Sequence, residues 1–288
     1  MNEPSWLAER FEDNRKRLRA LAYRMLGSLS EADDAVQEAW LRLGRADADS
    51  VQNLAGWLTT VVARVSLDTL RVRRSNREDA VGARMPDPIV DGLDPEDEAV
   101  MTDSVSLALL VVLETLDPAS RLAFVLHDMF AVPFDEIGRI VGKTPAAARQ
   151  LASRARRRVQ GAATPPDADL ASAREVVAAF LAASRDGHFD ALLQVLDPDV
   201  VLRSERDATS RLVRGASAVA KRTVVGLRLA GFVRLVLVNG TPGLVSYDAE
   251  GEPHSVVGFT IRRGRITEID ILADPTRLRQ LDLAARDD

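Results

Sequence analysis

The sequence predicts two small all-α modules, the second carrying a helix-turn-helix, followed by an α+β domain. Three observations support this fold class. Apolar residues recur with a helical period up to about residue 161, Pro/Gly-rich segments interrupt that pattern twice, and short Val/Ile/Leu runs separated by turn residues fill much of the remainder. The predicted domains are a helical domain at 5–80, an acidic linker at 81–103, a second helical domain at 104–161 and an α+β domain at 168–288.

The clearest helix of the first module is expected from Ser30 to Leu43. Ser30 suits the N-cap position, and small and apolar residues follow on one side at helical spacing. The opposite side is acidic and polar with one apolar residue: Asp33, Asp34, Gln37, Glu38 and Leu41. Taken alone, such a face is either solvated surface or a partner site.

A longer helix should follow, with Trp57 on its apolar stripe and therefore in the core. Its far end is basic, with one acid, Asp68, against five arginines: Arg64, Arg71, Arg73, Arg74 and Arg77. Clustered guanidinium groups bind phosphate whatever the base sequence, but the helix macrodipole also favours a basic C-terminus. Both interpretations remain open from the residues alone.

The linker concentrates negative charge that the net charge of −5 conceals. Between residues 86 and 105 there is no base and there are seven acids: Asp87, Asp91, Asp94, Glu96, Asp97, Glu98 and Asp103. A run of this kind is either a soluble tether or a mimic of nucleic acid that shields basic surfaces or occupies a basic channel.

The second module contains the helix-turn-helix pattern. Asp117 and Pro118 are suited to open one helix, Gly142 to end a short second one, and Thr144 with Pro145 to begin a third that runs to about residue 159. The packing side of this last helix is small and apolar. Its outward side mixes groups that read base edges with groups that bind phosphate: Arg149, Gln150, Ser153, Arg154 and Arg157.

After Gly161–Pro166 the pattern changes to α-α-β-α-β-β-β-β. Helices are expected at about 173–181, 189–196 and 216–229, and strands at 200–204, 232–238, 244–247, 254–262 and 266–272. Asn239-Gly240, Glu250-Gly251 and Arg263-Gly264 supply turns. A curved sheet wrapped on helices is the expected architecture.

Composition excludes several functions. The chain has no cysteine and three scattered histidines, so neither a disulfide nor a zinc site is expected, and no metal or cofactor is predicted. No uncharged apolar run is long enough for a membrane span, and the N-terminus has no signal-peptide pattern, which predicts a cytoplasmic protein.

Four segments carry a resemblance to bacterial sigma factors of the extracytoplasmic-function class: Leu21–Ser28, Glu31–Leu43, Ala55–Arg64 and Leu116–Val125 leading to the helix-turn-helix. The resemblance spans about residues 5–160. It implies that the acidic helix docks on the coiled-coil clamp of core RNA polymerase, that about 47–76 melts and holds the −10 element, and that the helix beginning at Pro145 reads the −35 element.

The resemblance assigns two sets of residues. The polymerase-binding residues would be Asp33, Asp34, Gln37, Glu38 and Leu41. The DNA-binding residues would be Arg64, Arg71, Arg73, Arg74, Thr144, Ala146, Arg149, Gln150, Ser153, Arg154 and Arg157.

The C-terminal part resembles the SnoaL-like, ketosteroid-isomerase-like cone fold, which includes enzymes and inert regulatory domains. Acid–base candidates are His188, Asp248, His254 and Asp270, but no motif selects any of them, and no catalytic residue is predicted. A subgroup of these sigma factors carries such a domain as a built-in regulator.

Three marks of that subgroup are partly present. Where the subgroup has Trp-Leu-Pro-Glu-Pro, this chain has Arg84-Met-Pro-Asp-Pro88. Where the subgroup has Asp-Gly-Gly-Gly-Lys, this chain has Asp207-Ala-Thr-Ser-Arg211, and where it has Asn-Pro-Asp-Lys-Leu, this chain has Asp274-Pro-Thr-Arg-Leu278. The resemblance implies contact of the cone domain with the sigma modules or the linker.

The predicted function is therefore that of a non-enzymatic sigma factor that directs transcription initiation and is modulated by its own C-terminal domain. The alternatives are a SnoaL-type isomerase or hydrolase fused to DNA-binding helices, and a DNA-binding repressor that never contacts polymerase.

Overall fold

The computed structural model describes residues 5–46, 53–76, 84–91, 105–162, 169–206, 209–228, 231–281 and 283. The chain forms two compact units. The first combines 1–81 with 112–162, and the second combines 82–111 with 163–288. The described part of the linker, 84–91, therefore belongs to the same unit as the C-terminal domain.

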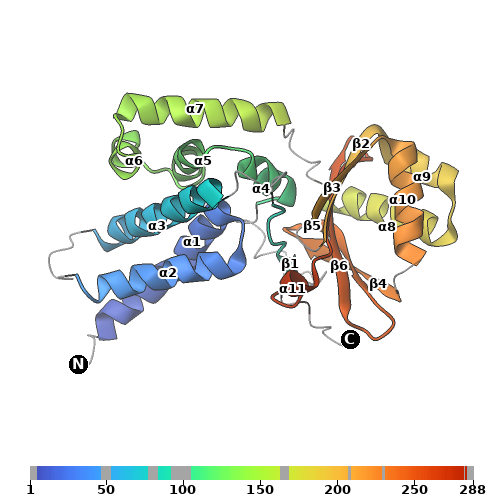
Figure 1. Ribbon diagram of the computed structural model, residues 1–288, viewed down its shortest axis with the longest axis horizontal. Helices are drawn as coiled ribbons and strands as arrows, with labels where there is room; N and C mark the ends of the chain where they lie inside the picture. The colour runs from blue at the N-terminus through green and yellow to red at the C-terminus, as the bar shows by residue number, and fades with distance from the viewer. Residues whose placement is uncertain are drawn as a thin grey trace. The chain divides into compact units, whose positions relative to one another are not determined.

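Three long helices build the first module (Figure 1): α1 (Ser5–Leu26), α2 (Leu29–Leu43) and α3 (Leu54–Asn76). The predicted small and apolar stripe of α2 is buried, with Ala32 and Ala39 fully enclosed. The helix begins slightly earlier than expected, because Ser28 and not Ser30 takes the N-cap position after Gly27 turns the chain at φ 65°.

The second module consists of α4 (Leu107–Glu114), α5 (Pro118–Phe124), a π-helical turn (Val125–Met129), α6 (Phe134–Val141) and α7 (Pro145–Ala162). Asp117 caps α5 as predicted, since its carboxylate accepts from the Ser120 backbone N–H at 3.0 Å. Partial burial acts to raise the pKa of Asp117, but the Ser120 hydrogen bonds and nearby arginine charges hold it below its ordinary value.

The second unit is a seven-stranded sheet with three helices on one face and a short helix packed on the other (Figure 1). Its helices are α8 (Leu170–Asp186), α9 (Phe189–Val195), α10 (Ala216–Arg228) and the short α11 (Pro275–Leu278). Its strands are β1 (Val90–Asp91), β2 (Leu196–Arg206), β3 (Thr209–Arg214), β4 (Phe232–Val238), β5 (Thr241–Tyr247), β6 (Pro253–Arg262) and β7 (Arg265–Leu272).

The sheet order is β1-β4-β5-β6-β7-β2-β3, and only the β2–β7 pairing is parallel among these strands. Asn239-Gly240 and Arg263-Gly264 form hairpin turns as predicted, and all four residues have positive φ. The α+β architecture expected from the sequence is confirmed.

The two faces of the sheet bury separate cores. On the helical face, α8, α9 and α10 pack on residues such as Leu244, Phe259 and Ile269. On the other face, Val245 and Leu272 pack against Met85 of the linker, Leu107 of α4 and residues of the C-terminal segment. Adjacent Leu244 and Val245 point to opposite cores, as the two-residue period of a strand requires.

Three elements were not predicted from the sequence: β1, β3 and α11. The two residues of β1 lie in the Pro/Asp-rich linker, where no alternating pattern exists. The β3 strand is exposed along nearly its whole length, so it carries no apolar alternation. In α11, one turn is capped by Asp274, whose carboxylate accepts from Thr276 N at 2.9 Å and Arg277 N at 3.0 Å.

Within the described residues, no helix combines the length and apolar character that crossing a membrane requires.

Candidate functional site

The helix-turn-helix is held by backbone conformation and close packing. Gly142 ends α6 with φ 70°, and Thr144 caps α7 by accepting from Ala147 N at 3.2 Å. Gly138 allows the turn to approach α6, since a Cβ there would lie 2.7 Å from the Lys143 carbonyl oxygen. The turn geometry therefore depends on two glycines and one cap.

The outward face of α7 is polar and exposed, while Ala148, Leu151, Ala152 and Ala155 are buried against the module. Of the predicted DNA-binding residues on this module, Ser153 is half-buried, and the others are exposed: Thr144, Ala146, Arg149, Gln150, Arg154 and Arg157. The exposed side thus combines guanidinium and amide groups with a small residue, which is the chemistry that major-groove recognition uses.

Two arginines of α7 already have partners within the module. Arg149 lies 5.3 Å from the centroid of the Phe134 ring, a cation–π contact that leaves it on the surface. Arg156 donates to Asp128 through Nε at 3.0 Å and Nη2 at 2.5 Å. Arg156 is thus held by a residue of its own module.

The basic end of α3 divides into two groups. Arg64, Arg71 and Arg74 are exposed, with Arg71 paired to Asp68 at 3.2 Å. Arg73 is different, because its Nη1 donates to the Leu26 carbonyl at 2.9 Å and its guanidinium pairs with Glu31. Arg73 thus ties α3 to the α1–α2 corner, and its geometry supports a structural role more than phosphate binding.

Residues 47–52 of the predicted −10 region lie outside the described residues, and so does Arg77 after α3. Trp57 is half-buried, so the prediction that it belongs to the core was too strong.

The acidic face of α2 is present as predicted. Asp34 and Gln37 are exposed, and Leu41, in the last turn of α2, keeps 45% of its surface exposed. Asp33 pairs with Arg19 at 2.6 Å and Glu38 with Arg42 at 2.8 Å. Both pairs are exposed and therefore contribute little to folding.

The two helical modules contact each other within their unit. Arg121 of α5 is 2% exposed and donates to the Arg24 carbonyl of α1 through Nε at 3.1 Å and Nη2 at 3.0 Å. Its Nη1 donates to Glu114 at 2.6 Å. The guanidinium groups of Arg24 and Arg17 lie over the Phe130 ring, 5.1 and 5.7 Å from its centroid.

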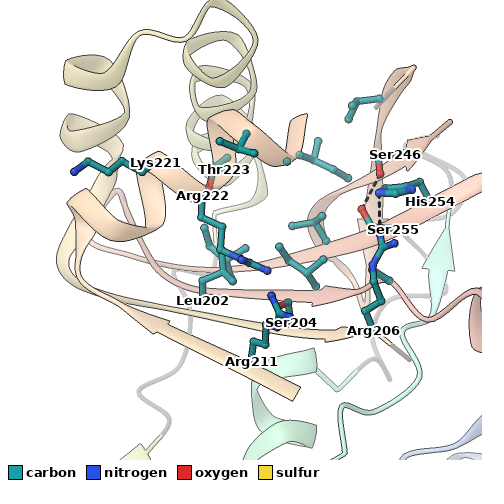
Figure 2. A pocket seen from close by; sticks show the side chains of 18 of the residues that line it. Leu202, Ser204, Arg206, Arg211, Lys221, Arg222, Thr223, Ser246, His254 and Ser255 are labelled. Carbon is teal, nitrogen blue, oxygen red and sulfur yellow. Dashed lines mark hydrogen bonds between the residues drawn. The ribbon is translucent and has the colours of Figure 1, made fainter. Parts of the chain in front are cut away.

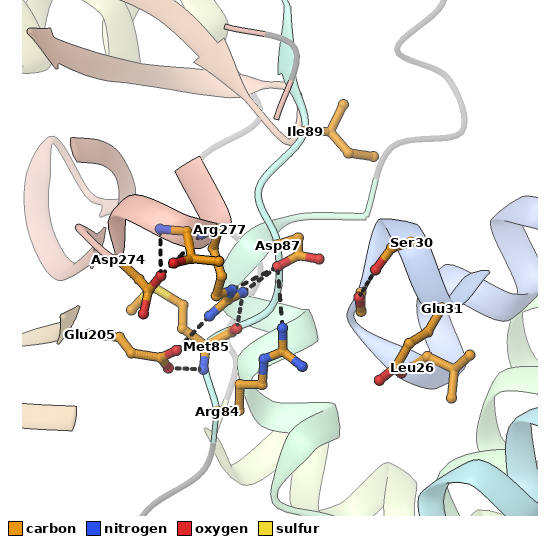
Figure 3. Close-up of polar contacts among 12 residues, drawn as sticks. Leu26, Ser30, Glu31, Arg84, Met85, Asp87, Ile89, Glu205, Asp274 and Arg277 are labelled. Atoms are coloured by element: carbon orange, nitrogen blue, oxygen red, sulfur yellow. Dashed lines mark hydrogen bonds and ion pairs between the residues drawn. The ribbon is translucent and has the colours of Figure 1, made fainter. Parts of the chain in front are cut away.

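In the second unit, the linker is bound to the C-terminal domain by a buried ionic network (Figure 3). Arg277 donates through Nε to Asp87 at 2.9 Å, through Nη1 to Glu205 at 2.5 Å and through Nη2 to the Met85 carbonyl at 2.7 Å. Glu205 in turn accepts from the Met85 backbone N–H at 2.7 Å. Arg277, Asp87 and Glu205 are all less than 9% exposed.

Backbone pairing extends this contact. Val90 pairs with Val238, so the linker adds a short antiparallel strand to the β4 edge. Asn239 exchanges hydrogen bonds with Ile89, accepting from Ile89 N at 3.1 Å and donating from its own backbone N–H at 2.8 Å. Two of the three marks noted in the sequence, at 84–88 and 274–278, thus meet each other. Of the third, residues 207–208 lie outside the described residues, and Thr209–Arg211 belong to β3.

The helical face of the sheet encloses a cavity of about 780 Å³, called here the cone cavity. Of the acid–base candidates, His254 lines it, and its pKa is lowered by burial and by the Arg206 charge. Asp270 is buried on the other face, beside Ser106 and Leu107. Burial and the Glu268 charge raise the pKa of Asp270 to about 6 against the opposing charge of Arg203.

The remaining two candidates are surface residues. His188 occupies the N-cap position of α9 and is exposed, and Asp248 accepts from the backbone N–H groups of Glu250 and Glu252 in the β5–β6 turn. The four groups are therefore not brought together.

Comparison with known proteins identifies the family. Residues 10–76 match the family model for Sigma-70 region 2, and residues 106–159 match the model for Sigma-70, region 4. The ECF RNA polymerase sigma factor SigJ of Mycobacterium tuberculosis (strain H37Rv) is 38% identical over 299 residues, covering 96% of this chain and 94% of SigJ. The chain belongs to the ECF RNA polymerase sigma factors.

Two further similarities extend over the sigma factor. A probable ECF sigma factor, SigI of Mycobacterium tuberculosis (strain CDC 1551), is 35% identical over 268 residues, or 91% of each chain. The crystal structure of SigJ superposes with a TM-score of 0.75 at 34% identity, covering 96% of this sigma factor and all of that chain. The C-terminal α+β domain is thus part of the architecture that this sigma factor shares with SigJ.

Membership of this family assigns the protein to promoter recognition with RNA polymerase. Sequence reasoning missed three residues that organise the structure: Arg121, Glu205 and Asn239. For Glu205 the sequence did contain a signal. Arg203 and Glu205 are two positions apart on β2, so their side chains point to the same face of the sheet. Two charged residues on one face indicate that this face has a polar partner. Arg121 lies on the buried side of α5, and no local sequence pattern indicates that this charged side chain is buried.

Proposed function

We propose that α7 reads the −35 element in the major groove, that α3 and the segment before it hold the −10 element, and that the acidic face of α2 docks on RNA polymerase. Reading of the −35 element by α7 is supported by its exposed polar face, which lies opposite small buried residues. The exposed Leu41 within an acidic face supports the third, because an apolar residue ringed by charge suits a protein partner.

Promoter binding requires the helical unit to open. The two elements are separated by about 25 base pairs, which is roughly 85 Å of B-form DNA at about 3.4 Å a step. The α3 helix, with 23 residues, is about 35 Å long at about 1.5 Å a residue. Modules joined through Arg121 are too close together to engage both elements, so this contact belongs to the free protein.

The C-terminal domain regulates the protein by holding the linker. While Asp87 is enclosed with Arg277, residues 84–91 are unavailable to any channel of polymerase, and the docked linker therefore lowers activity. The buried network at Arg277 is the single observation that carries this proposal. Removal of one partner from such a network leaves buried charge uncompensated, which typically costs about 3–5 kcal/mol.

Transcription in vitro with core polymerase tests this regulation. The Arg277→Ala protein should release the linker and give several-fold more promoter-specific transcript than the unmodified protein. Arg279→Ala is the matched control, because Arg279 immediately follows α11 but is exposed. Equal transcription from all three proteins, despite increased amide hydrogen exchange at 84–91 in Arg277→Ala, would refute regulation through the linker.

The same transcription experiment is repeated with a chain truncated after about residue 165, which lacks the C-terminal domain. Altered transcript yield with unchanged promoter choice is expected, since the helical modules remain. Loss of promoter choice would instead place sequence recognition in the removed domain.

We also infer that the C-terminal domain acts without substrate turnover. This is supported by the separation of the acid–base candidates, of which only His254 lines the cone cavity among the described residues. Measurable turnover of an isomerase or hydrolase substrate by the full chain, lost in His254→Ala, would overturn this inference.

A further inference from the structure

The cone cavity has an apolar interior. It lies between the helical layer and the sheet, and its volume of about 780 Å³ falls in the range of small-molecule sites. Its apolar lining comes from α8 and from alternate residues of four strands: Phe180, Leu202, Leu244, Val257, Ile269 and Ile271. At the rim, Val225 keeps 63% of its surface exposed, which adds apolar surface at the entrance.

The polar lining is cationic. Arg206, Arg211, Lys221 and Arg222 contribute to it, and no carboxylate lines the cavity among the residues that the structure describes. Figure 2 shows the side chains of Arg206, Arg211 and Arg222 turned toward the interior, whereas Lys221 extends away from it. Three guanidinium groups from β2, β3 and α10 thus face one partly enclosed apolar space.

The partners of these arginines within the described chain are not anionic. Arg206 donates through Nη2 to Nε2 of His254 at 3.0 Å, an acceptor that must be neutral. Burial and the Arg206 charge lower the pKa of His254, while the Asp248 charge opposes them. No ion pair with a carboxylate of the described residues is formed by Arg206, Arg211 or Arg222.

Two hydroxyl groups also line the cavity, near His254 and Arg206. Ser246 and Ser255 lie on neighbouring strands, are buried and share a hydrogen bond of 2.7 Å between their Oγ atoms (Figure 2). Each hydroxyl retains further hydrogen-bonding capacity. The cavity therefore combines an apolar surface, a small polar anchor and positive charge without an internal counter-charge.

We propose that the cone cavity is a binding site for a small organic anion with an apolar body, such as an amphiphilic carboxylate or phosphate monoester. The apolar body packs on Phe180, Leu244 and Ile269, and the anionic head accepts charge-assisted hydrogen bonds from Arg211 and Arg222. A guanidinium fork matches both carboxylate and phosphate oxygens, so the cavity selects charge and amphiphilicity more than one head group.

Calorimetric titration of the full-length chain tests the proposal with probes that share a ten-carbon tail. Decanoate and decyl phosphate supply two anionic heads, decanol a neutral head and decyltrimethylammonium a cationic one, each used below its micelle concentration. Saturable one-to-one binding is expected for at least one anion, at least tenfold tighter than for the alcohol or the cation. The ratio between the two anions distinguishes a carboxylate ligand from a phosphate ligand.

Substitutions locate the site. Arg211→Gln and Arg222→Gln should each weaken binding of the preferred anion at least fivefold, whereas Arg214→Gln, on the same strand as Arg211 but outside the cavity lining, should change it less than twofold. Arg211 lies on an exposed strand, so Arg211→Gln keeps the test valid if Arg222→Gln fails to fold, which thermal unfolding reveals. Equal binding of decanol and the anions, no binding of either anion, or equal loss in Arg214→Gln and Arg222→Gln would overturn the proposal.

Discussion

Arg277 and Arg121 are 7% and 2% exposed, and each joins segments far apart in the sequence. Arg277 connects α11 to residues about 190 positions earlier through Asp87 and the Met85 carbonyl. Arg121 connects α5 to the Arg24 carbonyl of α1. Buried arginines are costly unless every N–H group finds an acceptor, so such residues strongly specify which segments lie together.

At the proposed DNA-reading face, individual α7 residues should differ in effect. Arg149→Ala or Gln150→Ala should alter preference among −35 sequences, because a bidentate base contact contributes about 1–3 kcal/mol of discrimination. Arg157→Ala should instead weaken binding evenly and reduce the salt slope by about 0.9, as expected for one phosphate contact. Promoter binding at several salt concentrations provides the measurement. Equal loss on all sequences from the Gln150 change would contradict base reading there.

Asp270 predicts a pH dependence of stability. Its pKa is about 6 in the folded protein against an ordinary value of 3.8, so the folded state holds this proton more tightly than the unfolded state. Its contribution to stability is full below pH 4 and is lost as the pH rises to about 6. The free energy of unfolding of Asp270→Asn, relative to the unmodified chain, should therefore increase by about 2 kcal/mol between pH 4 and pH 7.

Denaturant unfolding at a series of pH values measures this difference. Arg203 keeps Glu268 as a partner at 2.6 Å in the variant, so loss of Asp270 does not leave the arginine unpaired. A difference that stays constant across the pH range would show that Asp270 ionises normally.

At the scale of elements, short segments do much of the positioning. The two residues of β1 cover part of the β4 edge, and an edge strand left open is a site for unwanted pairing. The one-turn helix α11 positions Arg277 against Asp87 and Glu205. The turn between α6 and α7 sets the direction of α7. These segments are too short for periodicity to reveal, and their conformations depend on caps, glycines and tertiary partners.

Gly138→Ala should disturb the helix-turn-helix. The added Cβ would meet the Lys143 carbonyl, a backbone atom that cannot move without opening the turn. We expect a loss of about 1–3 kcal/mol in stability and weaker promoter binding. The control is Gly161→Ala in the same module, where nothing lies within 4 Å of the added atom. Thermal unfolding and promoter binding are the measurements, and similar behaviour of the two variants would contradict the packing argument.

At the scale of the whole molecule, the chain forms two units whose boundary does not follow the sequence order. The linker residues 84–91 lie between the helical modules in sequence but fold with the C-terminal domain. The sequence predicted that the acidic linker is a soluble tether or a mimic of nucleic acid, and Asp87 does not fit this prediction because it is buried. Five of the other acids lie outside the described residues: Asp94, Glu96, Asp97, Glu98 and Asp103.

Arg121→Ala should loosen the contact between the helical modules. The change removes both hydrogen bonds to the Arg24 carbonyl and leaves Glu114 without this partner. We expect a larger radius of gyration by X-ray scattering and tighter binding to core polymerase. Arg139→Ala, at an exposed position of α6, should change neither quantity. Circular dichroism distinguishes opening from unfolding, and unchanged scattering with retained helicity would refute the opening requirement.

The sequence by itself determined the order of helices and strands, the helix-turn-helix with its caps at Asp117, Gly142 and Thr144, and the acidic and basic helix faces. These features are local, because periodicity, capping and turn preference act within a few residues of the chain. The family resemblance rested on the same local patterns.

Only the tertiary structure decided that Asp87 meets Arg277, that Arg73 serves the α1–α2 corner, and that three arginines face one apolar cavity. Such pairings join segments separated by tens to nearly 200 residues, and the energy of a buried charge depends on whichever group the fold brings to it. Whether an arginine binds phosphate, joins two helices or binds a ligand therefore depends on the group that the fold places beside it.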